Sequence, residues 1–503
     1  MVVGLGGAAG DAAAAPAAAL IHAPLSVEPA PIPRPAFESA LAAARDFNAL
    51  AASVAADHAW LEATLAPAAA AGDAFTARLL ALRRGTARTP PTDLALAVTR
   101  ADFMAHAPTG ALLQVELNTI ASSFGCLGGC ASALHAASAA RAGWGADALA
   151  RLPPNTAKAS IAAALAAGAA ASGLGREGVI LFVVQPGERN AYDQAALAEQ
   201  LWAAHGLVTV RATLEEVAAK GRLEGSGGDG PAEDPRAPPG GRPARVLTYD
   251  GVPVAVAYLR AGYGPGDYPS EAAWAGRALL ERSTAAVCPT AAWQLAGSKK
   301  VQQALAGAGV TEAFLAGAPG ASPASVAASA ARVRSHYAGL WSLDAADHVS
   351  AASPDGRAAL AALLRDAAAR PGAFVLKPQR EGGGNNTYGP ALGAAAAKAA
   401  ASLEAGGDGG LGAFILMQRI EPPSHGATLV RGGVASDGPV PCVSELGIFG
   451  AWLGRGGDGE GGPPPPPLLN EPAGHLVRTK PAGADEGGVA AGFAVLSSPY
   501  LVG

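Results

Sequence analysis

The chain has few charged residues and few cysteines. Of its 503 residues, 15% are charged and four are cysteines, and the formal net charge is −5. Four cysteines are too few for a disulfide-stabilised scaffold. A slightly negative chain has no general attraction to phosphodiester backbones, so nucleic acid is not expected as a partner. Half of the residues are apolar, which is ample material for a buried core.

Long hydrophobic runs and targeting signals are also lacking. No run of about 18 strongly apolar residues occurs, so no membrane span is expected. The nearest candidate, residues 159–175, is mostly Ala, Gly and Ser and fits a buried helix better. The first twenty residues contain no Lys or Arg, which a secretory signal or transit peptide would need. A cytoplasmic location is expected, with a plastid copy left open if the true start lies upstream.

Motifs for common metal sites and nucleophiles are missing. The sequence has no HExxH and no GxSxG. Cys126 and Cys130 form a single CxxxC with His135 close by in sequence, and no second pair accompanies them. Reduced, packed thiols are therefore a better interpretation of these cysteines than a zinc site.

Glycine and proline are abundant, at 66 and 40 residues, but unevenly spread. Residues 221–245 and 454–472 contain almost no bulky apolar side chain and are expected to be unstructured insertions. In residues 31–82, bulky apolar side chains recur at helical spacing and predict two helical stretches. Elsewhere strand-like and helix-like segments alternate, which favours a mixed α/β (α+β) enzyme over a helix bundle or a β-sandwich.

The segment LLQVELN, Leu112–Asn118, predicts a strand with a polar face. Side chains alternate along a strand, so Gln114, Glu116 and Asn118 are expected on one face. A carboxylate and an amide oxygen two residues apart can both reach one Mg²⁺, which prefers oxygen ligands. The alternative is a solvated polar face.

The segment FVLKPQREGGGNNTYG, residues 374–389, combines a strand with a glycine-rich loop. The strand ends in Lys377, which can supply a point charge to a phosphate. Gly382, Gly383 and Gly384 would let backbone N–H groups approach an anion closely. Glu381 is placed to link a metal ion to a nucleotide. The alternative, a plain surface turn, rarely carries so many polar groups.

Four further groups point to an anionic or amino-acid-like ligand. Arg478 and Lys480 are two apart, so a strand there would point both charges the same way. Lys299 begins a helix-like segment and could meet a phosphate, or simply be solvated. Glu445 lies in an apolar strand and needs a partner, such as a ligand hydroxyl or amine. The fourth group, at the end of an apolar strand, is Glu188, Asn190 and Gln194.

Taken together, these stretches resemble the eukaryotic-type glutathione synthetase family of ATP-grasp ligases. The matching segments are QVELNTIASSFGCL, ERNAYDQ, YLRAGYGPGDY, LLERSTAAVCPTAAWQLAGSKKVQQ, FVLKPQREGGGNNTYG, FILMQRIEP, CVSELGIFGAW and GHLVRTKPAGADEGGVAAG. The resemblance implies an ATP-grasp fold with an N-terminal helical region and an inserted α/β substrate-binding domain. The implied division is 1–176, 177–298 and 299–503.

The resemblance also implies an activity. It is the ADP-forming ligation of γ-glutamylcysteine to glycine through an acyl phosphate, which yields glutathione, ADP and phosphate. ATP would be a co-substrate and two Mg²⁺ ions would act in the site, in a homodimer that needs no membrane. Two alternatives stay open: a homoglutathione-type ligase that uses β-alanine, and a catalytically inactive ATP-binding homologue. The small pair Ala490 and Ala491 favours glycine over β-alanine.

Residue roles follow from the resemblance, position by position. The implied metal ligands are Glu116, Asn118 and Glu381. The implied catalytic residues are Arg478 and Lys377. The implied nucleotide contacts are Glu116, Lys299, Lys377, Gly382, Gly383, Gly384, Asn385, Asn386, Tyr388, Met417, Gln418, Arg419, Ile420, Glu445, Lys480 and Glu486. The implied substrate contacts are Arg100, Ile120, Ala121, Ser122, Ser123, Glu188, Arg189, Asn190, Gln194, Arg260, Tyr263, Arg478, Val489 and Ala490.

Two positions depart from the family pattern. Gln418 stands where animal relatives often carry Glu, a mild change if the backbone makes the contact. Glu486 stands where an Asp is usual, with Asp485 beside it. Which of these two acids reaches the nucleotide is left open.

Overall fold

The computed structural model describes residues 2–4, 20–86, 94–224, 245–349, 355–379, 385–455, 465–484, 487–489 and 492–503. Among these residues no helix combines the length and the apolar character that crossing a bilayer requires. The α-helices are α1 (Arg34–Ala56), α2 (His58–Ala70), α3 (Ala74–Thr86), α4 (Gly125–Arg141), α5 (Ala146–Leu149), α6 (Ala157–Ala171), α7 (Ala191–His205), α8 (Leu214–Lys220), α9 (Glu271–Arg282), α10 (Ala291–Ala296), α11 (Lys299–Leu305), α12 (Val310–Ala316), α13 (Pro323–Ser335), α14 (Gly356–Ala369) and α15 (Gly389–Glu404).

The strands form one large mixed sheet and three small ones. They are β1 (Val2–Gly4), β2 (Leu20–His22), β3 (Leu25–Ser26), β4 (Ala30–Pro33), β5 (Leu94–Ala105), β6 (Leu112–Asn118), β7 (Val179–Val183), β8 (Thr209–Ala212), β9 (Gly221–Glu224), β10 (Val246–Tyr249), β11 (Val252–Leu259), β12 (Ala286–Cys288), β13 (Leu340–Ser342), β14 (Phe374–Pro378), β15 (Phe414–Gln418), β16 (His425–Ala427), β17 (Leu429–Arg431), β18 (Val434–Ala435), β19 (Val440–Arg455), β20 (Leu469–Pro481), β21 (Val495–Ser497) and β22 (Pro499–Val502).

The large sheet runs in the order β18-β17-β3-β21-β20-β19-β5-β12-β11-β10-β9. Strand β6 pairs with β5, and β7 pairs with both β11 and β8. The parallel pairing of β12 with β5 joins the strands of 177–298 to the rest of the sheet. One continuous sheet therefore spans all three expected regions, and the expected domain boundaries stay a prediction.

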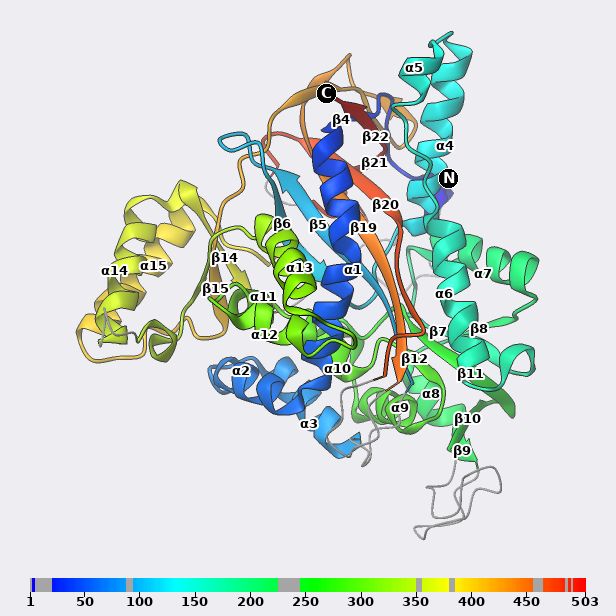
Figure 1. Cartoon of the computed structure of the whole chain (residues 1–503), viewed down its shortest axis with the longest axis horizontal. Helices are drawn as coiled ribbons and strands as arrows, with labels where there is room; N and C mark the ends of the chain where they lie inside the picture. The colour runs from blue at the N-terminus through cyan, green and yellow to red at the C-terminus, as the bar shows by residue number, and fades with distance from the viewer. Residues whose placement is uncertain are drawn as a thin grey trace, which may run out of the picture.

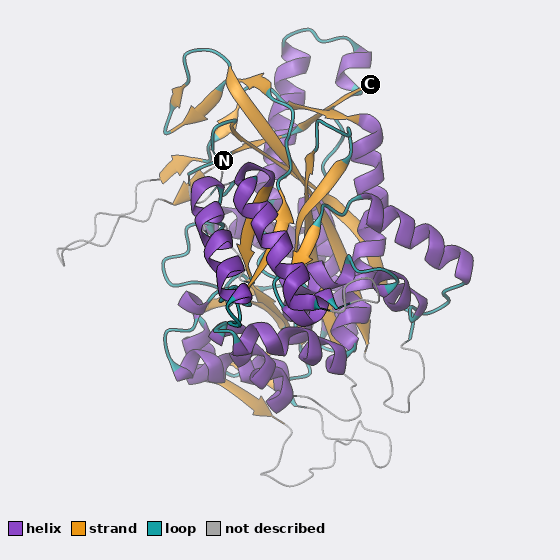
Figure 2. Ribbon diagram, turned by 90° about the vertical axis from the view of Figure 1, so that its left-hand side faces the viewer, coloured by secondary structure: helices purple, strands orange, loops and turns teal. Residues whose placement is uncertain are grey.

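Alternation along β5 explains why helices cover both faces of the sheet (Figure 1, Figure 2). Leu96 and Val98 pack with α4 and α6. Ala97, Ala101 and Phe103 pack with α1 on the opposite face. Successive strand side chains point to opposite faces, so a strand buried on both faces needs apolar residues at nearly every position.

A smaller layer stands beside the large sheet. Strands β13, β15 and β14 form a three-stranded antiparallel sheet covered by α14 and α15 (Figure 1, left). Its core includes Leu360, Leu364, Leu392 and Leu416. This layer carries Lys377 at the end of β14 and Met417 in β15, so it brings part of the expected nucleotide site to the large sheet.

Three local expectations are corrected by the structure. Residues 31–82 form three helices rather than two, because Asp57 caps α2 through Trp60 N (2.9 Å) and Asp73 caps α3 through Thr76 N (3.1 Å). Strand β9 begins at Gly221, inside the first expected insertion, because it pairs with β10. Strand β19 runs to Arg455 and β20 begins at Leu469, so their pairing trims the second insertion at both ends.

Candidate active site

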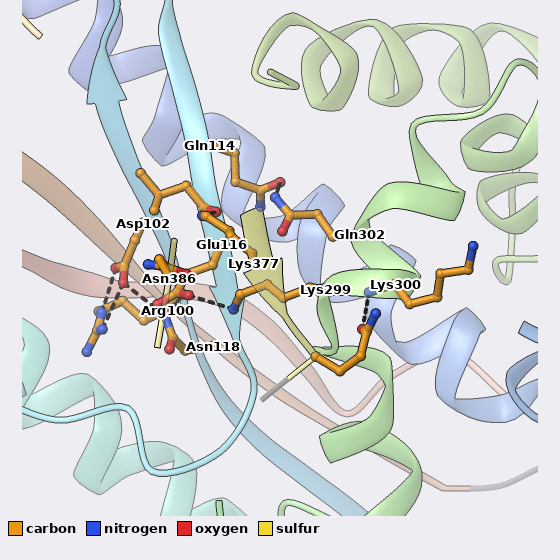
Figure 3. Close-up of polar contacts among 12 residues, drawn as sticks. Arg100, Asp102, Gln114, Glu116, Asn118, Lys299, Lys300, Gln302, Lys377 and Asn386 are labelled. Carbon is orange, nitrogen blue, oxygen red and sulfur yellow. Dashed lines mark hydrogen bonds and ion pairs between the residues drawn. The ribbon is translucent and has the colours of Figure 1, made fainter. Parts of the chain in front are cut away.

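Strands β5 and β6 bring four polar side chains together, as Figure 3 shows. Arg100 lies opposite Asn118, and Asp102 lies opposite Glu116. Directly opposed residues of an antiparallel pair project to the same face. The expected grouping of Glu116 with Asn118 therefore holds, and Arg100 and Asp102 join it from the neighbouring strand.

A bulge in β6 separates Gln114 from this group. The register shifts between Asp102 and Phe103, so Phe103 lies opposite Gln114 and one extra residue of β6 is left over. Gln114 is buried and accepts a hydrogen bond from Gln302 Nε2 (3.3 Å) instead of facing Glu116. The expectation that Gln114 shares the site face is wrong, because the bulge interrupts the alternation.

Asp102 is a fully buried carboxylate, 0% exposed, at the centre of the group. Arg100 donates to it through Nε (2.6 Å) and Nη2 (2.8 Å). Asn118 Nδ2 donates to Asp102 Oδ2 at 2.8 Å, and Arg478 Nη2 donates to the same oxygen at 2.9 Å. Asp102 is not among the residues that the sequence predicts for the site. Its spacing of two from Arg100 on one strand was the signal that could have found it.

Arg478 bridges two acids. It lies opposite Glu445 in the pairing of β19 with β20, and its Nη2 forms a short ion pair with Glu445 Oε1. Burial would lower the pKa of Arg478, but the charges of Glu445, Asp102 and Glu116 raise it. Burial raises the pKa of Glu445, opposed by Arg478. The partner expected of Glu445 is thus Arg478, a group of the same chain.

Glu116 is surrounded by cations. Lys299 Nζ lies 2.6 Å from Glu116 Oε2, and Lys377 Nζ donates to Val115 O at 2.9 Å. Burial would raise the pKa of Glu116, but the charges of Lys299 and Lys377 lower it. The carboxylate is therefore ionised at neutral pH, the state that a divalent cation requires.

A cavity of about 230 Å³ opens beside this charged group. Its walls are mostly apolar and come from the large sheet, through Met104 and Val115, and from the small layer, through Val375 and Met417. Lys377 and Lys480 are among the residues that line it. A mostly apolar cavity with a few cations in its wall suits a flat, hydrophobic ring that carries an anionic tail.

Arg260 organises the loop that follows β6. This residue is 4% exposed and donates through Nη1 to Ser122 O (2.9 Å) and through Nη2 to Ser123 Oγ (2.6 Å). Arg100 Nη1 donates to Ser123 O at 3.2 Å. Burial would lower the pKa of Arg260, and the dipole or charge of Tyr258, Asp193 and Glu188 raises it. Two guanidinium groups therefore face one loop.

Buried amides stand next to Arg260. Glu188 accepts from Asn190 N (2.7 Å) and from Gln194 Nε2 (2.8 Å), which fixes both residues at the start of α7. Both amide atoms of Asn190 and Oε1 of Gln194 are buried, and none of the three has a hydrogen-bond partner among the residues that the structure describes. Buried polar atoms normally have partners, so these three are suited to a polar ligand.

The comparisons with known proteins agree with this geometry. A family model described as "Eukaryotic glutathione synthase, ATP binding domain" matches residues 4–501. The chain is 39% identical to the chloroplastic glutathione synthetase of Solanum lycopersicum over 490 residues, which cover 97% of this chain and 79% of that one. It is 37% identical to the glutathione synthetase of Homo sapiens over 489 residues, 96% and 90% of the two chains. The chain belongs to the eukaryotic glutathione synthase family.

A solved structure supports the fold. A glutathione synthetase-like effector from Globodera pallida superposes with a TM-score of 0.69 at 20% identity, over 96% of this chain and 91% of that one. The mixed α/β fold, the eukaryotic glutathione synthase family and the ATP-dependent ligase class expected from the sequence are thus confirmed.

The nucleotide residues expected for a glutathione synthase fall into two groups. The cavity wall includes Lys377, Tyr388, Met417, Gln418, Arg419, Ile420 and Lys480. Glu116, Lys299 and Glu445 lie in the charged group instead. Asn386 Nδ2 donates to Tyr388 OH at 3.1 Å, and Asn385 is exposed. Outside the described residues lie Glu381, Gly382, Gly383, Gly384, Asp485 and Glu486.

The substrate residues expected for the family are mostly brought together. Arg100, Ser122, Ser123 and Arg260 share one hydrogen-bond network. Tyr263 OH accepts from Gln185 Nε2 at 2.8 Å. Ala121 has a left-handed φ of 52°. Arg189 is exposed, whereas Ile120 and Val489 are buried in cores. Ala490 and Ala491 lie outside the described residues.

Asp193 supports this loop and was also missed. Its carboxylate accepts from the backbone nitrogens of Phe124 (3.0 Å) and Leu127 (2.9 Å) at the start of α4. Burial raises its pKa, while the bonds to Leu127 and Phe124 act against that rise. Asp193 belongs to α7 but accepts from the start of α4, a helix far away in the sequence. Such a contact can be recognised only once the fold is known.

Proposed function

We propose that this chain joins the cysteinyl carboxylate of γ-glutamylcysteine to the amine of glycine at the expense of ATP. The observation that carries the proposal is the junction at Asp102 and Arg478. There the residues bonded to the loop that follows β6 come within electrostatic reach of Glu116, on which the cavity-lining Lys377 also acts. A carboxylate held on the loop side would lie beside a nucleotide phosphate held on the cavity side, which is the arrangement a phosphoryl transfer needs.

The chemistry divides into two steps. The carboxylate attacks the γ-phosphorus of ATP, which forms an acyl phosphate and releases ADP. The glycine amine then attacks the acyl carbon, the phosphate leaves, and the amine loses its proton. We assign Lys377 to the transferring phosphoryl group and Arg478 to the anion that develops at the acyl carbon. Both side chains are mostly buried, so their charges act in a low-dielectric site.

Glu116 and Asn118 fit a magnesium site. The carboxylate of Glu116 is ionised and pairs with Lys299 through Oε2, and Asn118 donates through Nδ2 to Asp102, which turns its amide oxygen away from that acid. Bound magnesium would neutralise phosphate charge there. We assign Glu381 as a further ligand, and two ions per site, on the family resemblance alone.

A second specificity, for β-alanine instead of glycine, is the main alternative. The small residues Ala490 and Ala491 favour the shorter amine. A catalytically inactive nucleotide-binding homologue is the other alternative, and the presence of Glu116, Asn118, Lys377 and Arg478 in one connected site argues against it.

The test is ADP release by the purified chain in a coupled assay. We expect turnover that needs both γ-glutamylcysteine and glycine. Faster turnover with β-alanine would replace the assignment by the homoglutathione-type activity. Binding of ATP without ADP release in the presence of both substrates would leave the inactive homologue as the correct description.

Assembly and domain division are further proposals that rest on the family. We propose a homodimer, which sedimentation of the full chain would test, and the division at 177 and 299, which limited proteolysis would test. We also propose a cytoplasmic location, although the relatives include a chloroplastic form. Imaging of a tagged full-length gene product would decide between the cytoplasm and a plastid.

A further inference from the structure

Asp102 connects residues with three different expected tasks. Its carboxylate binds Arg100, assigned to the dipeptide substrate, Asn118, assigned to magnesium, and Arg478, assigned to the reacting acyl group. The three donors come from three strands, β5, β6 and β20. We propose that Asp102 is a positioning residue which sets substrate arginine, metal amide and catalytic arginine relative to one another. This inference rests on the proposed function for the names of the three tasks.

The donor set fits the two acceptor oxygens of a carboxylate and does not fit an amide. Oδ1 accepts from Arg100 Nε at 2.6 Å. Oδ2 accepts from Arg100 Nη2 (2.8 Å), Asn118 Nδ2 (2.8 Å) and Arg478 Nη2 (2.9 Å). Every neighbour is a donor, so the NH₂ group of an asparagine at this position would point at another donor whichever way it turned. Removal of one partner from such a buried network leaves its donors unsatisfied.

The bond from Asn118 also decides which end of that amide faces a cation. Asn118 donates through Nδ2 to Asp102 and, at 3.3 Å, to Arg100 O. Both bonds hold Nδ2 of Asn118 towards Asp102, so Oδ1 of Asn118 points away from Asp102, where it can bind a cation. Partners that orient a metal ligand in this way typically change metal affinity or activity by about 10–100-fold when they are replaced.

The sheet leaves space for the Arg100–Asp102 pair at Gly447. Gly447 of β19 lies opposite Asp102. A Cβ at this position would meet Arg100 Cδ and Asp102 Oδ1, each at 2.7 Å, which is closer than real Cβ contacts. A methyl group here would displace the pair without changing the chemistry of either residue. Gly447→Ala is therefore an independent way to disturb Asp102.

The first experiment compares Asp102→Asn with Asp46→Asn. Asp46 is a matched control: it is buried, accepts from Arg332 Nε (2.7 Å) and Nη2 (3.1 Å), and joins α1 to α13, neither of which carries a residue assigned to the site. Calorimetry would measure binding of γ-glutamylcysteine, and binding of ADP as a function of Mg²⁺ concentration. For Asp102→Asn we expect about 10–100-fold weaker dipeptide binding and a similar rise in the Mg²⁺ required. For Asp46→Asn we expect unchanged binding.

These binding measurements need no turnover, so they separate the two proposals. A wild-type chain without ADP release would refute the proposed function, while the dependence of binding on Asp102 would still be decided. Unchanged dipeptide and Mg²⁺ binding in folded Asp102→Asn would overturn the positioning role. Equal losses in Asp46→Asn would also overturn it, because the effect would then be one of general stability.

The second experiment asks whether Asp102 acts through Arg478. We expect Asp102→Asn to lower kcat less in an Arg478→Lys background than in the wild-type chain, since one of the three groups that the acid positions has then already been lost. Multiplied losses in the double variant would contradict this. If Asp102→Asn does not fold, Gly447→Ala replaces it, with dipeptide binding and Mg²⁺ dependence shifted in the same direction; unchanged binding in a folded Gly447→Ala chain would count against the proposal.

Discussion

The two ends of the site are built in opposite ways. The nucleotide end is a cavity whose wall is largely apolar, with Val115, Val375 and Met417 among the residues that line it. The substrate end is a set of charged and polar side chains bonded to loop backbone, centred on Arg260. Dispersion and apolar burial are spread over many atoms, whereas each hydrogen bond to a charged group is a large single contribution.

This difference predicts how each end fails. Loss of one methyl group from a cavity wall removes a small share of the total contact, so effects there should be graded. Loss of one donor from the loop network leaves several buried acceptors without a partner, so effects there should be abrupt. A conservative substitution at the substrate end that left activity unchanged would contradict this difference between the two ends.

The largest effect is expected for Arg260→Lys. Lysine keeps the charge but lacks the planar fork that reaches Ser122 O and Ser123 Oγ together. We expect kcat/KM for γ-glutamylcysteine to fall roughly 10²–10³-fold, as two charge-assisted bonds are lost, with the KM for ATP little changed. Steady-state kinetics with each substrate varied in turn would measure both.

Arg332→Lys is the matched control for that change. Arg332, like Arg260, makes hydrogen bonds through two nitrogens of its guanidinium group, in this case both to Asp46. It lies outside the residues assigned to the site. We expect unchanged kinetics. If Arg260→Lys behaved like Arg332→Lys, the substrate end would not depend on the geometry of its guanidinium group.

Local sequence patterns predicted the elements of both ends but not the contacts between them. Strand Leu112–Asn118 has the bounds that its alternation predicts. The bulge that turns Gln114 away is set by pairing with β5, and the meeting of Arg478 with Glu445 is set by the register of β19 on β20. Register depends on partner strands far along the chain, so it cannot be read from one segment.

Charge partners were the other part that the sequence could not supply. The sequence predicts that Glu445 needs a partner, such as a ligand group, and that partner is Arg478, 33 positions away. Asp102 was missed because an acid in a strand is usually solvated, and only its 0% exposure shows otherwise. Arg478 and Lys480 could be predicted together because they lie two residues apart, so their grouping is visible within one segment of the sequence.

A graded effect is expected for Val115→Ala at the nucleotide end. Val115 lines the cavity and its backbone oxygen accepts from Lys377 Nζ, a bond that an alanine keeps. Two methyl groups are lost, at about 0.8 kcal/mol each, so we expect the KM for ATP to rise roughly 10-fold with kcat little changed. A change in the KM for γ-glutamylcysteine of similar size would contradict the separation of the two ends.

An acid-dependent loss of stability is expected from β20, the strand that serves both ends. His475 is 3% exposed, its Nε2 has no hydrogen-bond partner within the described part of the chain, and burial lowers its pKa from 6.5 to about 4. The unfolded chain therefore binds this proton at a higher pH than the folded chain does. The contribution of neutral His475 to the free energy of unfolding is therefore fully present above about pH 6.5. It declines by up to about 3 kcal/mol as the pH falls towards about 4.

His475→Phe tests that decline. Phenylalanine preserves an aromatic contact with Phe37, whose ring centroid lies 5.4 Å from that of His475, and it cannot be protonated. We expect the variant to lose less stability than the wild-type chain between pH 6.5 and 4, measured by denaturant unfolding. Other histidines with lowered pKa values, among them His135 and His336, remain in both chains and contribute equally. Parallel curves would contradict the assignment to His475.

The smallest effect is expected for Gln418→Glu, beside the nucleotide cavity. Gln418 Oε1 accepts from Gly339 N (3.0 Å), and its Nε2 lies 3.3 Å from His106 Nε2. His106 Nδ1 accepts from Glu421 N at 3.1 Å, so the proton of the neutral ring is on Nε2 and faces another donor. A carboxylate would accept from both sides. We expect up to about 1 kcal/mol of added stability and a KM for ATP within about 3-fold of the wild-type value. Lower stability in the variant would mean that the Gln418 amide is turned the other way and that its oxygen already accepts from His106.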